Sequence, residues 1–313
     1  MLKLGLAGTW HVHFDGYVRE FLNTGKCEIV SLWDSKEENA KLKSEELNIP
    51  YFTNIDEFLK TDIDAVMVCC ETSIHPDVYI KIANAKKHIF TEKVLCETPT
   101  QADEVRKAVK ESGIKFCISF PWRSRADFLW MKNAVDSGLL GDITCVRMRN
   151  AHNGVSAGWL PDTFLNKEDT CGGAMMDLGA HSMYILNWLL GKPEAASSVF
   201  TNVICKSVED NCVSVLRYKS GAIGVSETSF VAQNDPFSLQ ITGTKGTALA
   251  GWHSDELKYN TGDGWIKPEL GEGELSPVRL FVNGVVENAE IPYSIDDAYD
   301  LTYTMNLAYQ NIL

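Results

Sequence analysis

The sequence has 313 residues, of which 45% are hydrophobic and 23% charged, which is ordinary for a folded globular protein and excludes a disordered, collagen-like or coiled-coil chain. Its 29 basic and 42 acidic residues give a net charge of −13, which would repel a phosphate backbone, so nucleic acid is not expected as a partner. No apolar run approaches the roughly 18 residues of a membrane span, so no membrane partner is expected either.

The nine cysteines are scattered, without a Cys-x-x-Cys pair or the spacing of a zinc site. Several lie in apolar, strand-like runs, where a reduced thiol behaves as a small hydrophobic side chain. The first residues read directly as a strand and lack the features of a signal peptide. These observations favour a reduced, cytoplasmic protein.

The first 120 residues alternate short apolar runs with amphipathic segments. Short strands that are apolar on both faces, separated by helices, indicate a parallel sheet covered on both sides. We therefore expect residues 1–120 to form an α/β domain of the Rossmann type, with a doubly wound parallel sheet that binds a dinucleotide. The expected strands are Leu2–Ala7, Glu28–Trp33, Ala65–Cys70, His88–Thr91 and Lys115–Phe120, and the expected helices include Lys36–Glu46, Pro76–Ala85 and Gln101–Glu111.

The pattern changes after about residue 121, where strands follow one another with glycine-containing turns between them. Such runs of strands indicate a mostly antiparallel sheet, and residues 121–313 are expected to form a second, α+β domain. Its expected helices are Ala126–Ser137, Leu178–Leu190 and Ile295–Leu313, and its expected strands are Thr144–Asn150, Ser198–Cys205, Cys212–Tyr218, Ala222–Ser229, Ser238–Gly243 and Thr247–Gly251.

A turn with the sequence Gly-Thr-Trp-His-Val-His follows the first expected strand. A dinucleotide fingerprint has G-x-G-x-x-G there, because its glycines allow a tight turn and a close approach to pyrophosphate. Only the first glycine is present in register, and Trp10 and His13 occupy the other two glycine positions. The residues expected to hold the pyrophosphate are Gly8, Thr9, Trp10, His11 and Val12, while an ordinary strand-to-helix loop remains the alternative.

Asp34 ends the second expected strand, 26 residues after Gly8. A carboxylate there can bond the ribose hydroxyls of the adenosine and disfavours a 2′-phosphate, so NAD is expected rather than NADP. The alternative is that Asp34 caps the helix beginning near Lys36. The positive charge of Lys36 also leaves NADP open.

Three segments together resemble a known family: Thr91-Glu92-Lys93, Gly138–Ile143, and the glycine-rich stretch from Gly172 to His181. In order and spacing they are similar to the glucose-fructose oxidoreductase, inositol dehydrogenase and rhizopine-catabolism family (Gfo/Idh/MocA), over nearly the whole chain. The resemblance implies a Rossmann domain followed by an α+β domain with an open sheet that often mediates homo-oligomers, here a dimer or tetramer. It also implies an NAD(P)-dependent enzyme that oxidises or reduces a sugar or polyol.

By the same resemblance, Lys93, Asp177 and His181 are the expected catalytic residues. The pKa of histidine, ordinarily near 6.5, suits a base that takes the hydroxyl proton while hydride passes to the cofactor. Asp177 precedes His181 by four residues, so on a helix both share a face and the carboxylate can orient the imidazole. The ammonium of Lys93 can hold the substrate oxygen. Each residue also has a structural alternative. Asp177 could cap the helix, His181 could be a hydrogen-bonded structural histidine, and Lys93 could be a solvated lysine at the end of a strand.

The family pattern further implies that Thr72, His75, Glu92 and Lys93 contact the cofactor. His75 could instead only decorate a helix start before Pro76.

Several positions depart from the family pattern. Val94 replaces the proline that usually follows the lysine, so a cis peptide bond at 93–94 is not expected. Glu71 replaces a proline near the nicotinamide, and Tyr184 replaces an aspartate three residues after the helix histidine. The altered glycine turn keeps open a dinucleotide-binding regulator without catalysis. A sugar-cleaving or isomerising enzyme that uses bound NAD transiently is a further alternative.

Arg123, His152 and Trp159 are the expected substrate contacts, since Arg123 matches a family arginine and the other two lie on a loop suited to a polar substrate. Loops around 152–170 and 230–236 would shape the pocket. His11 and His13 suggest a metal, but two histidines at i and i+2 without a third partner are a weak signal, and no metal is expected.

Overall fold

The computed structural model describes residues 1–234, 236–251 and 256–313, which form two compact units. The first unit consists of Met1–Ser119 with Leu275–Thr302, and the second of Phe120–Glu274 with Tyr303–Leu313. The first division lies close to the boundary expected near residue 121. The return of Leu275–Thr302 to the first unit corrects the expectation of one unbroken second domain.

Helix α9 (Pro277–Val286) explains that return. Its side chain Phe281 is fully buried and packs edge-on against Phe21 and at a tilt against Phe90, both residues of the first unit. Buried aromatic contacts of this kind hold a segment to a core irrespective of its distance in sequence.

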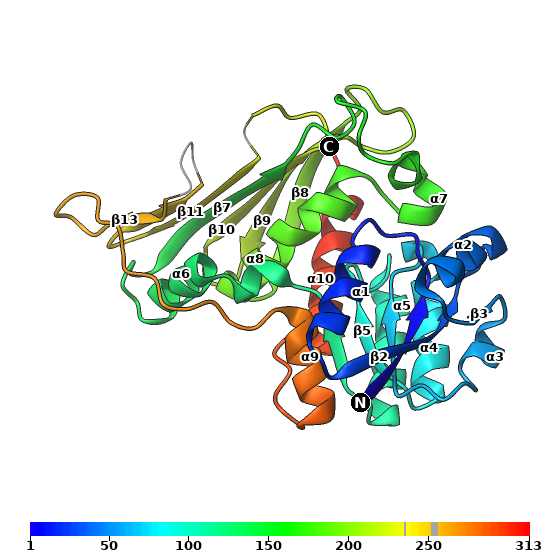
Figure 1. The fold of residues 1–313 in the computed structure, drawn as a ribbon. Helices are drawn as coiled ribbons and strands as arrows, with labels where there is room; N and C mark the ends of the chain where they lie inside the picture. The colour runs from blue at the N-terminus through cyan, green and yellow to red at the C-terminus, as the bar shows by residue number, and fades with distance from the viewer. Residues whose placement is uncertain (235, 252–255) are drawn as a thin grey trace. The chain divides into compact units, whose positions relative to one another are not determined.

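The first unit is built on a six-stranded parallel sheet with strand order β3-β2-β1-β4-β5-β6 (Figure 1). Helices α1 and α9 pack together, and so do α4 and α5, on opposite faces of this sheet, as right-handed crossovers require. The strands are β1 (Leu2–Ala7), β2 (Cys27–Trp33), β3 (Tyr51–Phe52), β4 (Ala65–Val68), β5 (His88–Thr91) and β6 (Phe116–Ile118). The helices are α1 (Phe14–Asn23), α2 (Glu37–Leu47), α3 (Ile55–Phe58), η1 (Thr72–Ile74), α4 (His75–Asn84) and α5 (Pro99–Ser112).

The strand order reverses between β1 and β4, which both run in the same direction and pair directly. All four residues of β4 are buried, as a central strand covered on both faces requires. In such sheets, ligands bind at the carboxyl ends of the strands where the order reverses. The turn after β1 therefore lies at the expected ligand position.

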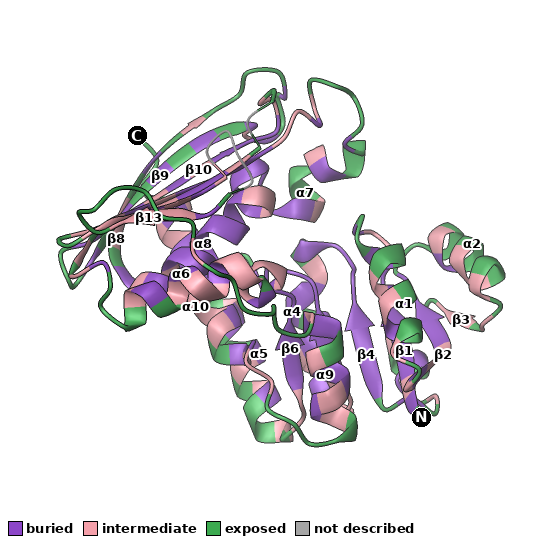
Figure 2. Cartoon of the chain, turned by 60° about the vertical axis from the view of Figure 1, so that its left-hand side comes forward, coloured by how far each residue is buried: buried purple, intermediate pink, exposed green. Residues whose placement is uncertain are grey.

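The second unit contains a seven-stranded sheet of order β13-β12-β11-β7-β10-β9-β8. Among the strand pairs of the described residues, β7 and β10 are parallel and the other pairs are antiparallel. Residues of β9 alternate between exposed and buried along the strand, so one face of the sheet is covered and the other is open (Figure 2). The strands are β7 (Ile143–Ala151), β8 (Pro193–Thr201), β9 (Asn211–Tyr218), β10 (Ile223–Ser229), β11 (Phe237–Gly243), β12 (Thr247–Ala250) and β13 (Lys258–Asn260). The helices are η2 (Pro121–Ser124), α6 (Ala126–Asp136), η3 (Asp162–Leu165), α7 (Lys167–Thr170), η4 (Met175–Gly179) and α8 (Ala180–Leu190).

The expected fold class, a parallel Rossmann-type sheet followed by a mostly antiparallel one, is confirmed. Helix α10 (Ile295–Gln310) carries residues of both units. Within the described ranges, no helix combines the length and apolarity needed to cross a membrane.

One strand is misplaced in the sequence analysis, which expects it at Ser198–Cys205. Strand β8 ends at Thr201, and the segment after it is a loop tied to Asp210, whose carboxylate accepts hydrogen bonds of 2.7 Å from the N–H groups of Val203, Ile204 and Cys205. A buried carboxylate that collects three backbone donors competes directly with strand pairing.

Candidate active site

The turn after β1 is held tightly against the end of β4. Gly8 has φ +80°, and a Cβ atom there would lie 2.4 Å from the Cα atom of Cys70, so only glycine fits. The N–H groups of Trp10 and His11 both donate to the carbonyl of Cys69 at 3.1 Å. The first glycine of the fingerprint thus has the role that the sequence suggests.

Asp34, at the end of β2, fixes this turn from the other side. Its Oδ2 accepts hydrogen bonds from the backbone N–H and hydroxyl of Thr9, at 2.9 and 2.7 Å, and its Oδ1 accepts one from the N–H of Lys36 at 2.9 Å. Burial raises the pKa of Asp34, and these hydrogen bonds act in the opposite direction. Asp34 therefore orients the turn and bonds the N–H of Lys36, but it does not cap α2, whose N-cap residue is Lys36 itself.

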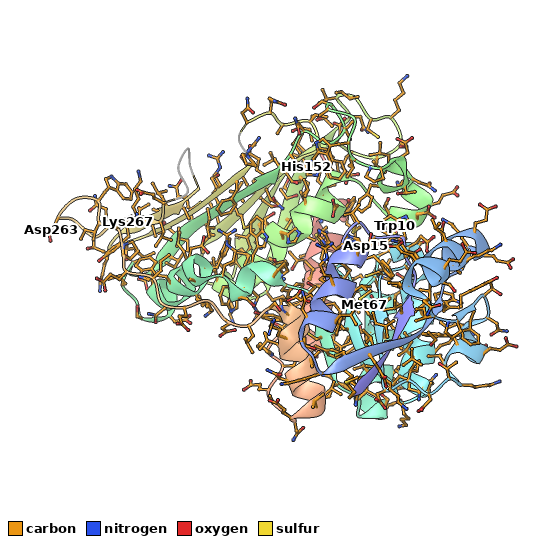
Figure 3. All side chains as sticks on the ribbon, viewed as in Figure 1. Trp10, Asp15, Met67, His152, Asp263 and Lys267 are labelled. Carbon is orange, nitrogen blue, oxygen red and sulfur yellow. The ribbon has the colours of Figure 1, made fainter. Side chains whose placement is uncertain are left out.

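Helix α1 begins just after the turn, at Phe14, and its N-cap residue His13 makes no side-chain capping bond. Figure 3 labels Trp10 and Asp15 near the N-terminal end of this helix. A tight glycine turn, a helix N-terminus and a carboxylate after β2 are the three features that hold a dinucleotide in this architecture. The residues present fit NAD in these respects, and the indole of Trp10 is an addition where the fingerprint has no side chain.

An ion pair that the sequence analysis missed lies at the ends of β2 and β4. The Lys36 ammonium is 2.8 Å from Oε1 of Glu71, whose side chain is buried, whereas that of Lys36 is 49% exposed. Thr72 follows directly and begins η1. The charge of Lys36, which kept NADP binding possible in the sequence analysis, is thus paired with Glu71. The two residues are 35 positions apart, and the strand order brings them together.

His75 is a buried link between two loops. Its Nδ1 lies 2.9 Å from the carbonyl of Val94, its Nε2 lies 3.2 Å from the carbonyl of Cys70, and the hydroxyl of Tyr79 is 3.2 Å from Nδ1. Burial lowers the pKa of His75, against the effect of the two carbonyls. With 2% of its surface exposed, His75 does more than decorate the start of α4.

Lys93 follows β5 and is buried with its neighbours. Its N–H donates to Oε2 of Glu92 at 2.7 Å. The peptide bond between Lys93 and Val94 is cis, which corrects the expectation drawn from the missing proline. The contacts of a buried segment decide this geometry here, because Val94 is 1% exposed and its carbonyl is bonded to His75.

Glu92 meets both histidines of the altered glycine turn. Its Oε1 lies 2.8 Å from Nδ1 of His13 and accepts a hydrogen bond of 2.5 Å from the hydroxyl of Tyr17. Burial would raise the pKa of Glu92, but His11 and His13 outweigh it and hold that pKa well below its usual range. Glu92 is thus a third potential metal ligand beside His11 and His13, and its distance along the chain hides it from the sequence pattern.

In the second unit, the ring of His181 is placed by aromatic side chains. It stacks on Trp122, with ring centroids 5.3 Å apart and planes at 21°. Its Nδ1 lies 3.1 Å from the hydroxyl of Tyr184, which also accepts the N–H of Trp122 at 3.3 Å. Tyr184, noted in the sequence only as a departure, is therefore a hydrogen-bond partner of His181.

Asp177 lies inside η4, a π-helical turn that runs directly into α8. The N-cap positions of the two segments are Ala174 and Gly179, so Asp177 does not occupy the N-cap position that the structural alternative supposes. Single π-turns of this kind are frequent at functional sites.

A half-buried acid, Glu209, anchors the start of that turn. Oε1 of Glu209 accepts hydrogen bonds from the N–H groups of Gly173 and Met175, at 2.7 and 3.3 Å, and from the hydroxyl of Tyr309 at 2.5 Å. A Cβ atom at Gly173 would lie 2.1 Å from the carbonyl oxygen of Glu209. The paired glycines of the family motif therefore serve close packing in this turn.

The three expected substrate residues also belong to the second unit. His152 stacks on Phe230 at 5.1 Å and 10° and lies 4.6 Å from the ring of Trp159, whose Nε1 donates to Asn153 Oδ1 at 3.1 Å. Figure 3 labels His152 at the end of the long strand β7. Arg123 is on η2, with its guanidinium 5.2 Å from the ring centroid of Trp188. Of the pocket loops expected from the sequence, residue 235 lies outside the described residues.

Family models match both units of the chain. Residues 2–120 match the model described as the oxidoreductase family with an NAD-binding Rossmann fold, and residues 128–249 match the GFO/IDH/MocA C-terminal domain. The chain belongs to the GFO/IDH/MocA family. The expected recognition is confirmed, and with it an oxidoreductase whose first unit has the NAD-binding Rossmann fold.

Curated relatives and solved structures agree with this. The chain is 26% identical to the myo-inositol 2-dehydrogenase of Thermotoga maritima, over 80% of this chain and 74% of that protein, and 25% identical to the D-glucoside 3-dehydrogenase of Escherichia coli, over 79% and 76%. A levoglucosan dehydrogenase in complex with NADH and levoglucosan has a similar fold, with a TM-score of 0.85, 18% identity and coverage of 99% and 96%. For the WlbA dehydrogenase of Bordetella pertussis in complex with NADH and UDP-GlcNAcA, the TM-score is 0.84, with 21% identity and coverage of 99% and 96%.

Proposed function

We propose that this oxidoreductase transfers hydride between NAD and a hydroxyl or carbonyl group of a sugar, a polyol or a close derivative. The observation that carries the proposal is the match of family models to both units, with relatives that include an inositol and a glucoside dehydrogenase. The local geometry of the dinucleotide turn and of His181 supports it.

The dinucleotide is assigned to the turn at the reversal of strand order. Gly8, Thr9, Trp10, His11 and Val12 would hold the pyrophosphate, and the N-terminal N–H groups of α1 would add to this binding. Asp34 would bond the ribose hydroxyls and favour NAD over NADP. When bound, NAD supplies the hydride acceptor for oxidation of an alcohol.

The residues that follow β4 and β5 are assigned to the nicotinamide half. These are Thr72, His75, Glu92 and Lys93. His75 would act by fixing the backbone of Cys70 and Val94, because both of its ring nitrogens face their carbonyls.

The role of the base that takes the proton of the substrate hydroxyl is assigned to His181. When Nδ1–H of the neutral ring donates to the Tyr184 hydroxyl, 3.1 Å away, Nε2 carries the lone pair and takes the proton of the substrate hydroxyl. Asp177 would stabilise the imidazolium that results, and the Lys93 ammonium would hold the substrate oxygen as negative charge develops. Reduction of a carbonyl reverses the proton's path.

Recognition of the substrate is assigned to Arg123, His152 and Trp159. A flat aromatic surface beside hydrogen-bonding groups suits a polyhydroxylated ring, which presents apolar C–H faces and polar edges. His152 and Trp159 lie side by side with their rings 4.6 Å apart and tilted by 54°, so either ring can offer its face to such a substrate.

The interface of a homo-oligomer is assigned to the open face of the second sheet. Four neighbouring apolar side chains there, Val199, Val213, Val215 and Ile223, are between 39% and 49% exposed. Contiguous exposed apolar surface marks an interaction site. All nine cysteines are free thiols, which supports a cytoplasmic location.

The test is a panel of polyols and sugars, myo-inositol among them, incubated with NAD and the purified protein while NADH formation is followed. At least one substrate should give NADH at a rate that Lys93→Met and His181→Asn each reduce by about a hundredfold or more. Lys107→Met, at an exposed lysine of α5, serves as the matched control and should retain activity.

Other outcomes would replace the proposal. Product that appears without accumulation of NADH would indicate cleavage or isomerisation with transient use of bound NAD. Dinucleotide binding without turnover of any substrate would favour a regulator.

A further inference from the structure

Three side chains of the first unit that can bind a metal ion come together where the glycine fingerprint is altered. One ligand atom from each of His11, His13 and Glu92 lies within 4.8 Å of the other two. The two imidazole rings have their centroids 4.7 Å apart, at 55°. His13 occupies the third glycine position of the fingerprint, so this cluster exists only because the fingerprint is lost.

The backbone fixes this arrangement. The N–H of His11 donates to the carbonyl of Cys69, and the N–H of His13 donates to Nδ1 of His11 at 3.2 Å. That bond uses the lone pair of Nδ1, so Nε2 is the nitrogen of His11 assigned to a metal. Glu92 stands directly after β5, where the hydroxyl of Tyr17 holds its Oε1 at 2.5 Å.

We propose that His11, His13 and Glu92 bind one divalent transition-metal ion, with zinc as the best match. Two imidazoles and one carboxylate are a known zinc ligand set, whereas magnesium and calcium prefer oxygen ligands throughout. Three protein ligands leave a coordination position open, as in zinc sites that carry an exchangeable ligand.

The distances are compatible with such a site after a small movement. Ligand atoms around a tetrahedral zinc ion, bound at about 2.0–2.2 Å, stand about 3.3–3.5 Å apart. His13 and Glu92 are already bonded at 2.8 Å. The side chain of His13 is 51% exposed, so its ring can rotate to complete the site.

The inference goes beyond the proposed function, because it requires neither a dinucleotide nor turnover. Its test therefore uses the full-length protein, free of any affinity tag, treated with chelator and titrated with zinc in calorimetry and in competition with a chromophoric chelator. The wild-type protein should bind about one equivalent of zinc per chain, and magnesium much more weakly.

Two variants test whether the zinc ion binds at this cluster. His13→Ala removes a half-exposed ring, and Glu92→Gln keeps an oxygen but removes the charge; each should weaken zinc binding by about tenfold or more. His88→Gln is the matched control, since His88 belongs to the same unit and accepts the N–H of Lys115 at 2.9 Å outside the cluster. Circular dichroism checks that each variant is folded.

Two results would overturn the proposal. One is a wild-type protein that binds zinc no more tightly than His13→Ala does. The other is a control variant that loses as much affinity as the cluster variants. Because His13→Ala changes an exposed side chain, it decides the question even if Glu92→Gln does not fold.

Discussion

The ion pair between Lys36 and Glu71 makes a prediction about cofactor choice. In wild-type protein the 2.8 Å contact holds the ammonium on a buried carboxylate and away from a 2′-phosphate. Replacing Glu71 by Gln removes this competitor and one negative charge. We expect Glu71→Gln to bind NADP more tightly relative to NAD.

The size of the effect follows from the exposure of the pair. With the Lys36 side chain 49% exposed, solvent screens the interaction, and such pairs contribute about 0.5–1 kcal/mol. Since about 1.4 kcal/mol corresponds to a factor of ten, the ratio of the Kd for NADP to that for NAD should fall by about two- to fivefold.

The assay is titration of both dinucleotides by calorimetry, which needs no substrate. The same change in a Lys36→Met background should leave the ratio unaltered, because the ammonium is absent. Glu45→Gln, at an exposed acid of α2, controls for the loss of one charge. An unchanged ratio in Glu71→Gln, or an equal shift in the Lys36→Met background, would refute the reasoning.

Three further predictions concern single side chains. Tyr184→Phe removes the hydroxyl 3.1 Å from His181 Nδ1 and keeps the ring, so kcat/KM should fall by about tenfold and the pH profile should shift. Because the hydroxyl also accepts the N–H of Trp122, the melting temperature should fall slightly. An unaltered pH profile would contradict a positioning role. Burial lowers the pKa of His75 in the folded state. The stability that neutral His75 contributes is therefore present above the unfolded-state pKa of about 6.5 and is lost as the pH falls towards the lower folded-state pKa. His75→Gln should flatten the decline of the melting temperature below about pH 6.5, and an identical decline in wild type and variant would sink this account. Gly173→Ala should destabilise the fold by about 2–4 kcal/mol, because its Cβ would lie 2.1 Å from a carbonyl oxygen. Gly271→Ala is the control and should be neutral, because the space around that position is open. Urea unfolding of both variants gives the comparison.

Local patterns in the sequence correctly predict the parallel sheet, the tight turn at Gly8 and the position of Asp34 at the end of β2. Strand β1 and the turn at Gly8 are read from a few consecutive residues, because burial on both faces and a positive φ each restrict the residue types locally. Asp34 is found by its distance along the chain. The same approach misplaces β8, since pairing with β9 and the backbone bonds of Asp210 decide where that strand ends.

Two pairs within the candidate site depend on strand order and are not visible in sequence. Glu92 meets His13 across 79 positions, and Lys36 meets Glu71 because β2 and β4 flank β1. Tyr184 is only three residues from His181, and helical spacing alone could have found that pair.

The central claim is that the altered turn still binds NAD. The most direct measurement is a calorimetric titration of NAD, NADH and NADP into purified protein from which carried-over dinucleotide has been removed, with intrinsic tryptophan fluorescence as a second signal. The account predicts one saturable site per chain with NAD bound more tightly than NADP, and weaker NAD binding in Asp34→Ala. A folded protein that binds none of the three dinucleotides would contradict it.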